Sequence, residues 1–335
     1  MNPVITVVMS VYNGERFLGE AIESILGQSC AELEFIILDD GSTDASARIS
    51  TSFDDPRIRV VRHNRNLGLA ASLNVGFSLA AGRYIARMDA DDISLPTRLA
   101  RQVAFMDAHP HVGVCGSWIE VRGEGIQQVW EYPTDSDTIH ARLLFDCALA
   151  HPSVMLNRVT MQKARLFYDS SYPCAQDYDL WTRAAPCVPL ANIPEVLLMR
   201  RLHAAQAGQH RAETQRVWAR KIREGQLERL GLSPTFTQGR MHEAISTWSW
   251  SATDGFVMEA ESWLQLLCRA NREKRIYPEP AFARVVGERW KAICQSVEPT
   301  LGRRFWSSSL SVAVDLGWKQ NLVGRVRRRL AMMAN

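Results

Sequence analysis

Three carboxylates lie within four residues of the segment MDADD, residues 88–92. Asp89, Asp91 and Asp92 directly follow a short apolar run, and their negative charges repel one another. Aspartate is favoured in turns and at helix N-caps, so a capping turn would explain the cluster. Aspartate also supplies the hard oxygen ligands that Mg²⁺ and Mn²⁺ prefer, and a bound cation would relieve the repulsion. The segment by itself leaves both explanations open.

The residues before this cluster alternate between strand and helix patterns. Short apolar runs at residues 4–10, 33–40, 57–61 and 83–89 are typical of buried parallel strands. Helical patterns at residues 17–26, 40–49 and 69–80 separate these runs. Strands and helices that alternate through short loops predict an α/β fold, in which helices cover both faces of a mostly parallel sheet.

Polar residues occupy the carboxyl ends of three of the predicted strands. Ser10 ends the first, Asp39 and Asp40 end the second, and Asp89 ends the fourth. Ligands of open α/β sheets bind at the carboxyl ends of the strands. A capping turn would not require polar groups from three strands at one edge, so this convergence favours a ligand site.

The pattern changes from about residue 112. Residues 112–121 and 150–158 are predicted strands, and residues 174–185 are a predicted helix. Residues 188–203 are predicted to form two closing strands separated by a turn at Pro194. The chain after His203 is mainly helical in pattern. We therefore expect a nucleotide-binding domain over residues 1–205 and a helical region over residues 206–335.

The composition of 46% hydrophobic and 22% charged residues is that of an ordinary globular protein. No apolar stretch approaches the ~20 residues that span a bilayer. The N-terminus has no basic segment and resembles a first strand more than a signal peptide. The seven cysteines are scattered without a CxxC pair, which argues against a disulfide framework or a structural zinc site. A cytoplasmic location is expected.

Charge is distributed unevenly along the chain. Residues 1–210 contain 18 basic and 24 acidic side chains, whereas residues 211–335 contain 21 and 12. Residues 303–329 also interleave basic and aromatic side chains, as in helices that lie on anionic membranes. A solvated helical face is the ordinary alternative, and nucleic-acid binding is a further use of basic patches. We expect peripheral membrane contact through this region and no nucleic-acid partner.

Four ordered motifs give the sequence a family resemblance. VVMSVYNGERFLGEAIESILGQS, EFIILDDGSTD, NLGLAASLNVGFSLAAGRYIARMDADD and AQDYDLWTR together resemble family 2 glycosyltransferases over residues 3–205. The resemblance implies the GT-A fold, an αβα sandwich, and transfer of a sugar from a nucleotide-sugar with inversion at the anomeric carbon. A UDP-sugar donor and a saccharide or lipid-linked saccharide acceptor are expected, in the synthesis of bacterial-type cell-surface polysaccharide or glycolipid.

The resemblance answers the question of the acidic cluster. It implies that Asp91 binds Mn²⁺ or Mg²⁺, which would offset the charge of the departing diphosphate. Asp89 matches the residue that approaches the ribose and the water shell of the metal. His203 matches a histidine near the metal or diphosphate, although a lone histidine is more often structural. Arg200 and Arg201 are either phosphate contacts or solvated loop charges.

The resemblance also implies the residues of the nucleotide pocket. Ser10 and Tyr12 match positions that line the base, and the Tyr12 ring offers a stacking face. Asp40 matches the carboxylate that accepts the ring N–H of the base, whereas Asp39 either caps the turn or contacts the nucleotide. Asn66 and Gly68 match a loop whose backbone approaches the nucleotide.

Asp177 matches the catalytic base of the family. An inverting transfer needs a base for the acceptor hydroxyl, and the start of a helix favours an ionised carboxylate. Gln176 stands where glutamate is commoner in the family. Asp179 is the alternative base, and His151 matches a stretch on the acceptor side.

Two other kinds of protein remain open from the residues alone. A nucleotidyltransferase also joins an αβα sheet to paired aspartates, although SVYNGERF is not a glycine-rich phosphate loop. A noncatalytic nucleotide-sugar-binding protein would fit if Asp177 were misassigned. A processive membrane-embedded synthase is disfavoured, because spanning helices and a Gln-x-x-Arg-Trp element are missing from the sequence.

Overall fold

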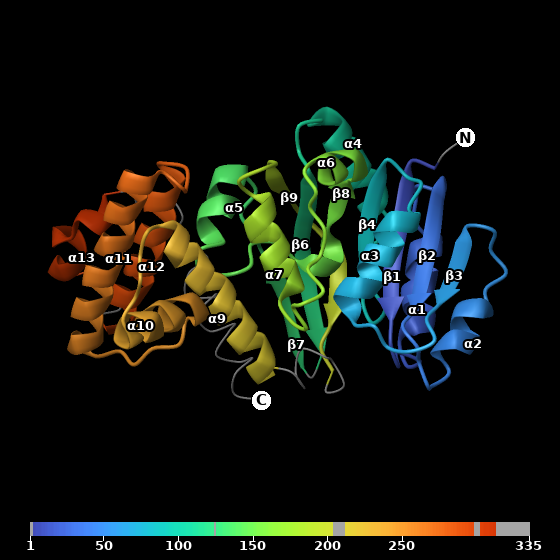
Figure 1. Ribbon diagram of the computed structural model, residues 1–335, viewed down its shortest axis with the longest axis horizontal. Coiled ribbons are helices and arrows are strands. Elements are labelled where there is room, and N and C mark those ends of the chain that lie inside the picture. Colours follow the sequence, from blue (N-terminus) through green and yellow to red (C-terminus); the bar gives the residue numbers. More distant parts are fainter. Residues whose placement is uncertain (1–2, 124, 204–211, 298–301, 313–335) are drawn as a thin grey trace. The chain divides into compact units, whose positions relative to one another are not determined.

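The computed structural model describes residues 3–123, 125–203, 212–297 and 302–312 (Figure 1). Contacts group the chain into two compact units. The first comprises residues 1–139 and 148–218, and the second comprises residues 140–147 and 219–335. The domain boundary expected after residue 205 stays a prediction.

The first unit is built on a nine-stranded sheet in the order β3-β2-β1-β4-β8-β6-β9-β5, with β7 paired to β6. The strands are β1 (Ile5–Val11), β2 (Leu33–Asp39), β3 (Ile58–Arg62), β4 (Tyr84–Asp89), β5 (Ile93–Ser94), β6 (Val114–Gly123), β7 (Ile126–Trp130), β8 (Met155–Asn157) and β9 (Leu190–Arg201). Strands β1, β2, β3, β4, β6 and β9 run in one direction, and β5, β7 and β8 run against them. The sheet is mostly parallel, as the sequence predicted.

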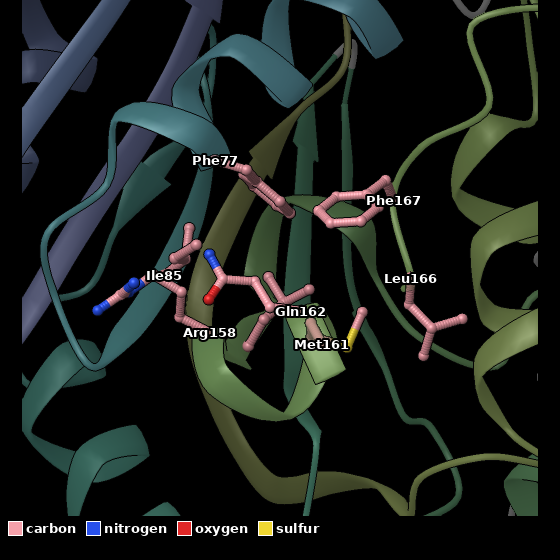
Figure 2. A pocket seen from close by; sticks show the side chains of 8 residues that line it. Phe77, Ile85, Arg158, Met161, Gln162, Leu166 and Phe167 are labelled. Carbon is pink, nitrogen blue, oxygen red and sulfur yellow. The ribbon is translucent and has the colours of Figure 1, made fainter. Parts of the chain in front are cut away.

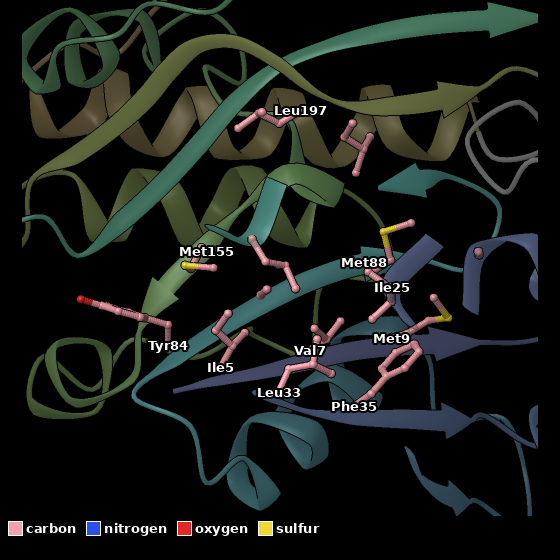
Figure 3. Packing of buried hydrophobic residues seen from close by; sticks show 14 of the residues in the cluster. Ile5, Val7, Met9, Ile25, Leu33, Phe35, Tyr84, Met88, Met155 and Leu197 are labelled. Atoms are coloured by element: carbon pink, nitrogen blue, oxygen red, sulfur yellow. The ribbon is translucent and has the colours of Figure 1, made fainter. Parts of the chain in front are cut away.

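Helices lie along both faces of this sheet (Figure 1). They are α1 (Leu18–Leu26), α2 (Ser46–Thr51), α3 (Leu69–Leu79), α4 (Arg98–Ala108), α5 (Ser136–Arg142), α6 (Arg158–Lys163) and α7 (Gln176–Ala184), with a 3-10 turn at His151–Ser153. Side chains alternate between the two faces of a strand. Ile5, Val7 and Met9 of β1 therefore pack with Ile25 of α1 in the main core (Figure 3).

Helix α3 packs against the opposite face. A side chain at Gly76 of α3 would place its Cβ 2.4 Å from the Val8 side chain and 2.8 Å from that of Leu38. Only glycine permits this close contact between helix and sheet. Two helical layers and one sheet thus form the αβα arrangement that the sequence predicted.

The prediction of two strands around Pro194 is wrong. Strand β9 continues from Leu190 to Arg201 and runs parallel to β6. Its register moves from Ser117–Ile193 to Trp118–Val196, so two residues of β9 are left unpaired at this point. Proline has no N–H to give to a ladder, and a bulge lets the strand pass it without a turn.

The second unit is helical. The helices of the C-terminal region are α9 (Ala212–Arg229), α10 (Phe236–Thr247), α11 (Asp254–Lys274), α12 (Ala281–Val297) and α13 (Arg303–Ser307), followed by a 3-10 turn at Ser309–Ser311. Phe145 packs into the core of this unit, and Asp146 is ion-paired to buried Arg289 at 2.8 Å. Within the described residues, no helix is both long and apolar enough to span a membrane.

Candidate functional site

The acidic cluster lies at the carboxyl end of β4. Ser10 of β1 pairs directly with Asp89 in the parallel ladder, so two predicted site residues are neighbours. Asp89, Asp91 and Asp92 each offer one carboxylate oxygen, and these oxygens all lie within 4.8 Å of one another. The sequence assigned no ligand role to Asp92, but the structure brings it into the same cluster.

The electrostatics of the cluster suit a cation. Burial, followed by the charge of Asp89, raises the pKa of Asp91 above its usual value. Burial and the charges of Asp89 and Asp91 raise the pKa of Asp92 well above its usual value. The Oδ2 atom of Asp92 is buried and has no hydrogen-bond partner among the described residues. Three hard oxygens that repel one another fit a hard divalent cation, which would remove the repulsion.

The end of β9 approaches this cluster. The Nε2 atom of His203 lies 3.0 Å from Oδ2 of Asp91, and the His203 ring contacts Phe17 with centroids 4.6 Å apart. The backbone N–H of Arg201 donates to Asp92 at 3.0 Å, while the Arg201 guanidinium is ion-paired with Glu20. His203 therefore lies beside Asp91, and a role of either residue at a metal stays a prediction.

Asp40 lies at the carboxyl end of β2 beneath a loop formed by residues 63–68. Its Oδ1 atom accepts the Leu67 N–H at 2.9 Å and lies 3.0 Å from Nδ1 of His63. Its Oδ2 atom accepts the N–H of Gly68 at 2.9 Å, at the start of α3. Gly68 has φ +89°, a conformation that favours glycine. Sequence reasoning assigned Asp40 and Gly68 separately and did not identify their hydrogen bond.

The other residues predicted to bind the nucleotide differ in how far they are exposed to solvent. Tyr12 leaves 50% of its surface exposed, so its ring is available for stacking. Asn66 is exposed. Asp39 is fully buried and accepts the Ser42 N–H at 2.9 Å, which is the capping alternative for this residue.

Asp177 lies in the first turn of α7 and is partly exposed. Burial raises its pKa above the usual value, and the Tyr178 backbone N–H and the charge of Arg87 oppose this shift. Asp179 is buried, and both Nε and Nη2 of Arg183 donate to its Oδ2. Asp179 is buried and engaged by Arg183, whereas Asp177 is partly exposed.

Sequence reasoning missed a buried arginine beside the cluster. Arg87 of β4 is 2% exposed and is ion-paired with Asp89. Its carbonyl accepts a 2.6 Å hydrogen bond from Arg98, which is also buried. Burial and the charge of Arg87 lower the pKa of Arg98 to about 9. Arg87 stands two residues before Asp89 on a strand, so the alternation of side chains was the signal that could have paired them.

His151 belongs to the interior next to Arg87. Its Nε2 atom lies 2.7 Å from the Tyr168 hydroxyl, and its ring contacts Trp181 at 6.3 Å between centroids. Burial and the charge of Arg87 lower the pKa of His151 well below its usual value. A buried and neutral histidine with a tyrosine partner fits the structural alternative.

A separate hollow lies between α3, β4 and α6 (Figure 2). It is lined mainly by apolar side chains, among them Phe77, Met161 and Phe167. The Nε atom of Arg158, its charged lining residue, donates to the carbonyl of Gly82 at 2.7 Å. The hollow has no cluster of polar groups, and the acidic cluster remains the better candidate site.

Comparisons with known proteins agree with this geometry. The family model described as glycosyl transferase family 2 matches residues 6–163. The amylovoran biosynthesis glycosyltransferase AmsE of Erwinia amylovora is 30% identical over 252 residues, which cover 72% of this chain and 92% of AmsE.

Two solved structures share the fold. Staphylococcus aureus TarS 1-349 in complex with UDP-GlcNAc has a TM-score of 0.58 at 18% identity, covering 87% of this chain and 90% of that one. The mannosyltransferase PcManGT of Pyrobaculum calidifontis, in complex with GDP-Man and Mn²⁺, has a TM-score of 0.53 at 16% identity, covering 93% and 85%.

Proposed function

The chain belongs to glycosyltransferase family 2 and has the GT-A fold, and from this premise we propose that it is an inverting transferase that uses a UDP-sugar. The observation that supports this most strongly is the convergence at the carboxyl ends of β1, β2 and β4. There the acidic cluster, the exposed ring of Tyr12 and the carboxylate of Asp40 occupy one edge of the sheet. Family membership leaves the nucleotidyltransferase and noncatalytic alternatives without support.

We assign the metal to Asp91 and Asp89, with His203 beside them. Asp91 and Asp89 have oxygens within 4.8 Å of one another and of Asp92, and PcManGT is an example of a structural neighbour with Mn²⁺. A bound Mn²⁺ or Mg²⁺ supplies positive charge against the diphosphate of the donor. His203 keeps Asp91 oriented through the 3.0 Å contact of its Nε2 atom.

The nucleotide is proposed to bind over Ser10, Tyr12, Asp40, Asn66 and Gly68. Tyr12 stacks on the base, and Asp40 accepts its ring N–H. The tight turn at Gly68 holds the loop backbone close to the nucleotide. TarS binds UDP-GlcNAc and PcManGT binds GDP-Man, so the shared fold accepts different bases. The selectivity for the base must then come from side chains of the nucleotide pocket.

Asp177 is proposed to remove the proton of the acceptor hydroxyl. The hydroxyl oxygen forms a bond to the anomeric carbon, the bond from that carbon to the phosphate oxygen breaks, and the nucleoside diphosphate leaves. The proton passes to a carboxylate oxygen of Asp177. Its raised pKa makes Asp177 a stronger base than an ordinary aspartate.

The acceptor is proposed to be a saccharide or a lipid-linked saccharide in cell-surface polysaccharide or glycolipid synthesis. AmsE is a glycosyltransferase of amylovoran biosynthesis, which supports a polysaccharide setting. We further propose peripheral contact with the cytoplasmic face of the membrane through residues 303–335. Residues 313–335 lie outside the described part, whereas Trp306 is described and is 53% exposed.

A donor screen tests this function. The protein is incubated with Mn²⁺ and with single UDP-, GDP- and dTDP-sugars, and nucleotide release and binding are measured. Metal-dependent release from a UDP-sugar is expected. Failure to bind or hydrolyse any nucleotide-sugar would contradict the proposal.

A further inference from the structure

The carboxylate of Asp40 is surrounded by three N–H donors from residues 63–68. The Leu67 amide and Nδ1 of His63 occupy Oδ1, at 2.9 and 3.0 Å, and the Gly68 amide occupies Oδ2 at 2.9 Å. A carboxylate only accepts hydrogen bonds, so Nδ1 of His63 bears the hydrogen. The side chain of Asp40 is 3% exposed, and that of His63 is 10% exposed.

This arrangement limits what Asp40 can still accept. A carboxylate has about four acceptor positions, two on each oxygen. His63 and Leu67 fill both positions of Oδ1, and Gly68 fills one position of Oδ2. One position remains, and it belongs to Oδ2.

The loop is held in place by packing. Gly41 has φ +75°, and a Cβ atom there would stand 2.6 Å from the carbonyl carbon of Arg65. The backbone of the loop therefore lies directly on Gly41. The hydroxyl of Ser72, on α3, lies 3.3 Å from the same Nδ1 atom of His63. The three donors around Asp40 are thus part of the folded protein before any ligand binds.

We propose that His63 is a positioning residue that makes the nucleotide site selective for a base with a single ring N–H. This inference rests on the proposed function, in which Asp40 accepts the ring N–H of the base. Uracil and thymine present one N–H between two carbonyl groups, which matches the single free position on Oδ2. Guanine presents a ring N–H beside an exocyclic amine and needs both oxygens of a carboxylate. His63 occupies the position on Oδ1 that guanine would require.

The His63→Phe variant tests this directly, because phenylalanine keeps an aromatic ring and removes the donor. Dissociation constants of UDP and GDP, and KM and kcat with UDP- and GDP-sugars, are measured for full-length protein in Mn²⁺. The wild type should prefer UDP and dTDP to GDP. In His63→Phe the ratio of UDP to GDP affinity should fall by roughly tenfold or more, since a hydrogen bond to a charged group is worth ~1.5–3 kcal/mol. The change should appear in KM for the donor and not in kcat with the UDP-sugar.

His63→Asn is the matched control, because its side-chain amide can donate from near the position of Nδ1 and should restore the wild-type ratio. His63→Gln serves if His63→Phe does not fold, and its displaced amide should give a ratio between those of the wild type and a donor-free site. Exposed His109→Phe controls for the loss of a histidine elsewhere.

The outcomes separate the two proposals. A folded His63→Phe protein with the wild-type ratio, or a wild type that prefers GDP, would overturn the role of His63 and leave the transferase intact. A wild type that binds no nucleotide would overturn both.

Discussion

Asp177→Asn separates the chemistry of transfer from the binding of the donor. Asparagine keeps the shape and the hydrogen-bonding capacity of aspartate, but it cannot take a proton at neutral pH. Loss of a general base lowers the rate by about 10²–10⁴-fold, which corresponds to roughly 3–5 kcal/mol in the activation barrier. Donor affinity should be unchanged, because Asp177 starts α7 whereas the nucleotide residues end β1 and β2.

The same variant should be at least as stable as the wild type. Burial raises the pKa of Asp177, so the folded protein disfavours the ionised form. The folded state then binds more protons than the unfolded state between the two pKa values, and wild-type stability falls as the pH rises through that window. Above the pKa that Asp177 has in the folded state, this loss of stability has reached its full size. A neutral asparagine removes this cost, and the melting temperature near pH 7 should not decrease.

The assay compares three measurements on one preparation. Transfer is followed by nucleotide release with acceptor, donor binding by calorimetry in Mn²⁺, and stability by thermal unfolding at pH 7 and near pH 4. Asp179→Asn is the matched control, since it removes a carboxylate from the same helical turn that is already paired with Arg183. Near-normal transfer by Asp177→Asn would show that the base is another residue. A large loss of stability would show that Asp177 is structural.

Three further predictions address the metal, the buried arginine and the C-terminal region. Asp91→Ala, like EDTA, should abolish transfer and weaken nucleotide binding in Mn²⁺, and full wild-type activity in EDTA would refute the metal role. Arg87→Met removes the buried partner of the ion pair with Asp89, so urea unfolding should report a loss of stability, smaller than the ~3–5 kcal/mol of a fully buried pair because the Asp89 side chain is 32% exposed, and a smaller loss still for Arg87→Lys. Truncation after residue 302 should reduce co-sedimentation with anionic vesicles, and added salt should reduce binding of the full chain; equal binding of both proteins would contradict this.

The framework of the site could be predicted because it depends on local patterns. Apolar runs locate the parallel strands, and parallel strands bring their carboxyl ends to one edge. The pairing of Ser10 with Asp89 follows from these two facts. The start of α7 was likewise predicted within two residues, since the acidic first turn and the apolar face of the helix are both visible in the sequence.

The parts that were missed depend on contacts between distant segments or on exceptions to average behaviour. Arginine is rarely buried, so average behaviour argues against an Arg87 that is 2% exposed, and only its place two residues before Asp89 on one strand indicated their ion pair. The three donors around Asp40 come from a loop more than twenty residues later in the chain. Proline usually ends a strand, yet β9 passes Pro194 through a bulge.

Withdrawal from water raises the pKa of Asp91 and of Asp177, but the two carboxylates use that shift differently. The pKa of Asp91 is also raised by the neighbouring charge of Asp89, and a divalent cation cancels that repulsion. For Asp177 burial is the largest cause of the raised pKa and the charge of Asp89 is the last, while the charge of Arg87, which remains whether or not a metal is present, lowers it. Metal binding should therefore release protons from the acidic cluster and leave the basicity of Asp177 largely intact. The two proposed roles, cation binding at the end of β4 and proton transfer at the start of α7, therefore depend on different causes of a raised pKa.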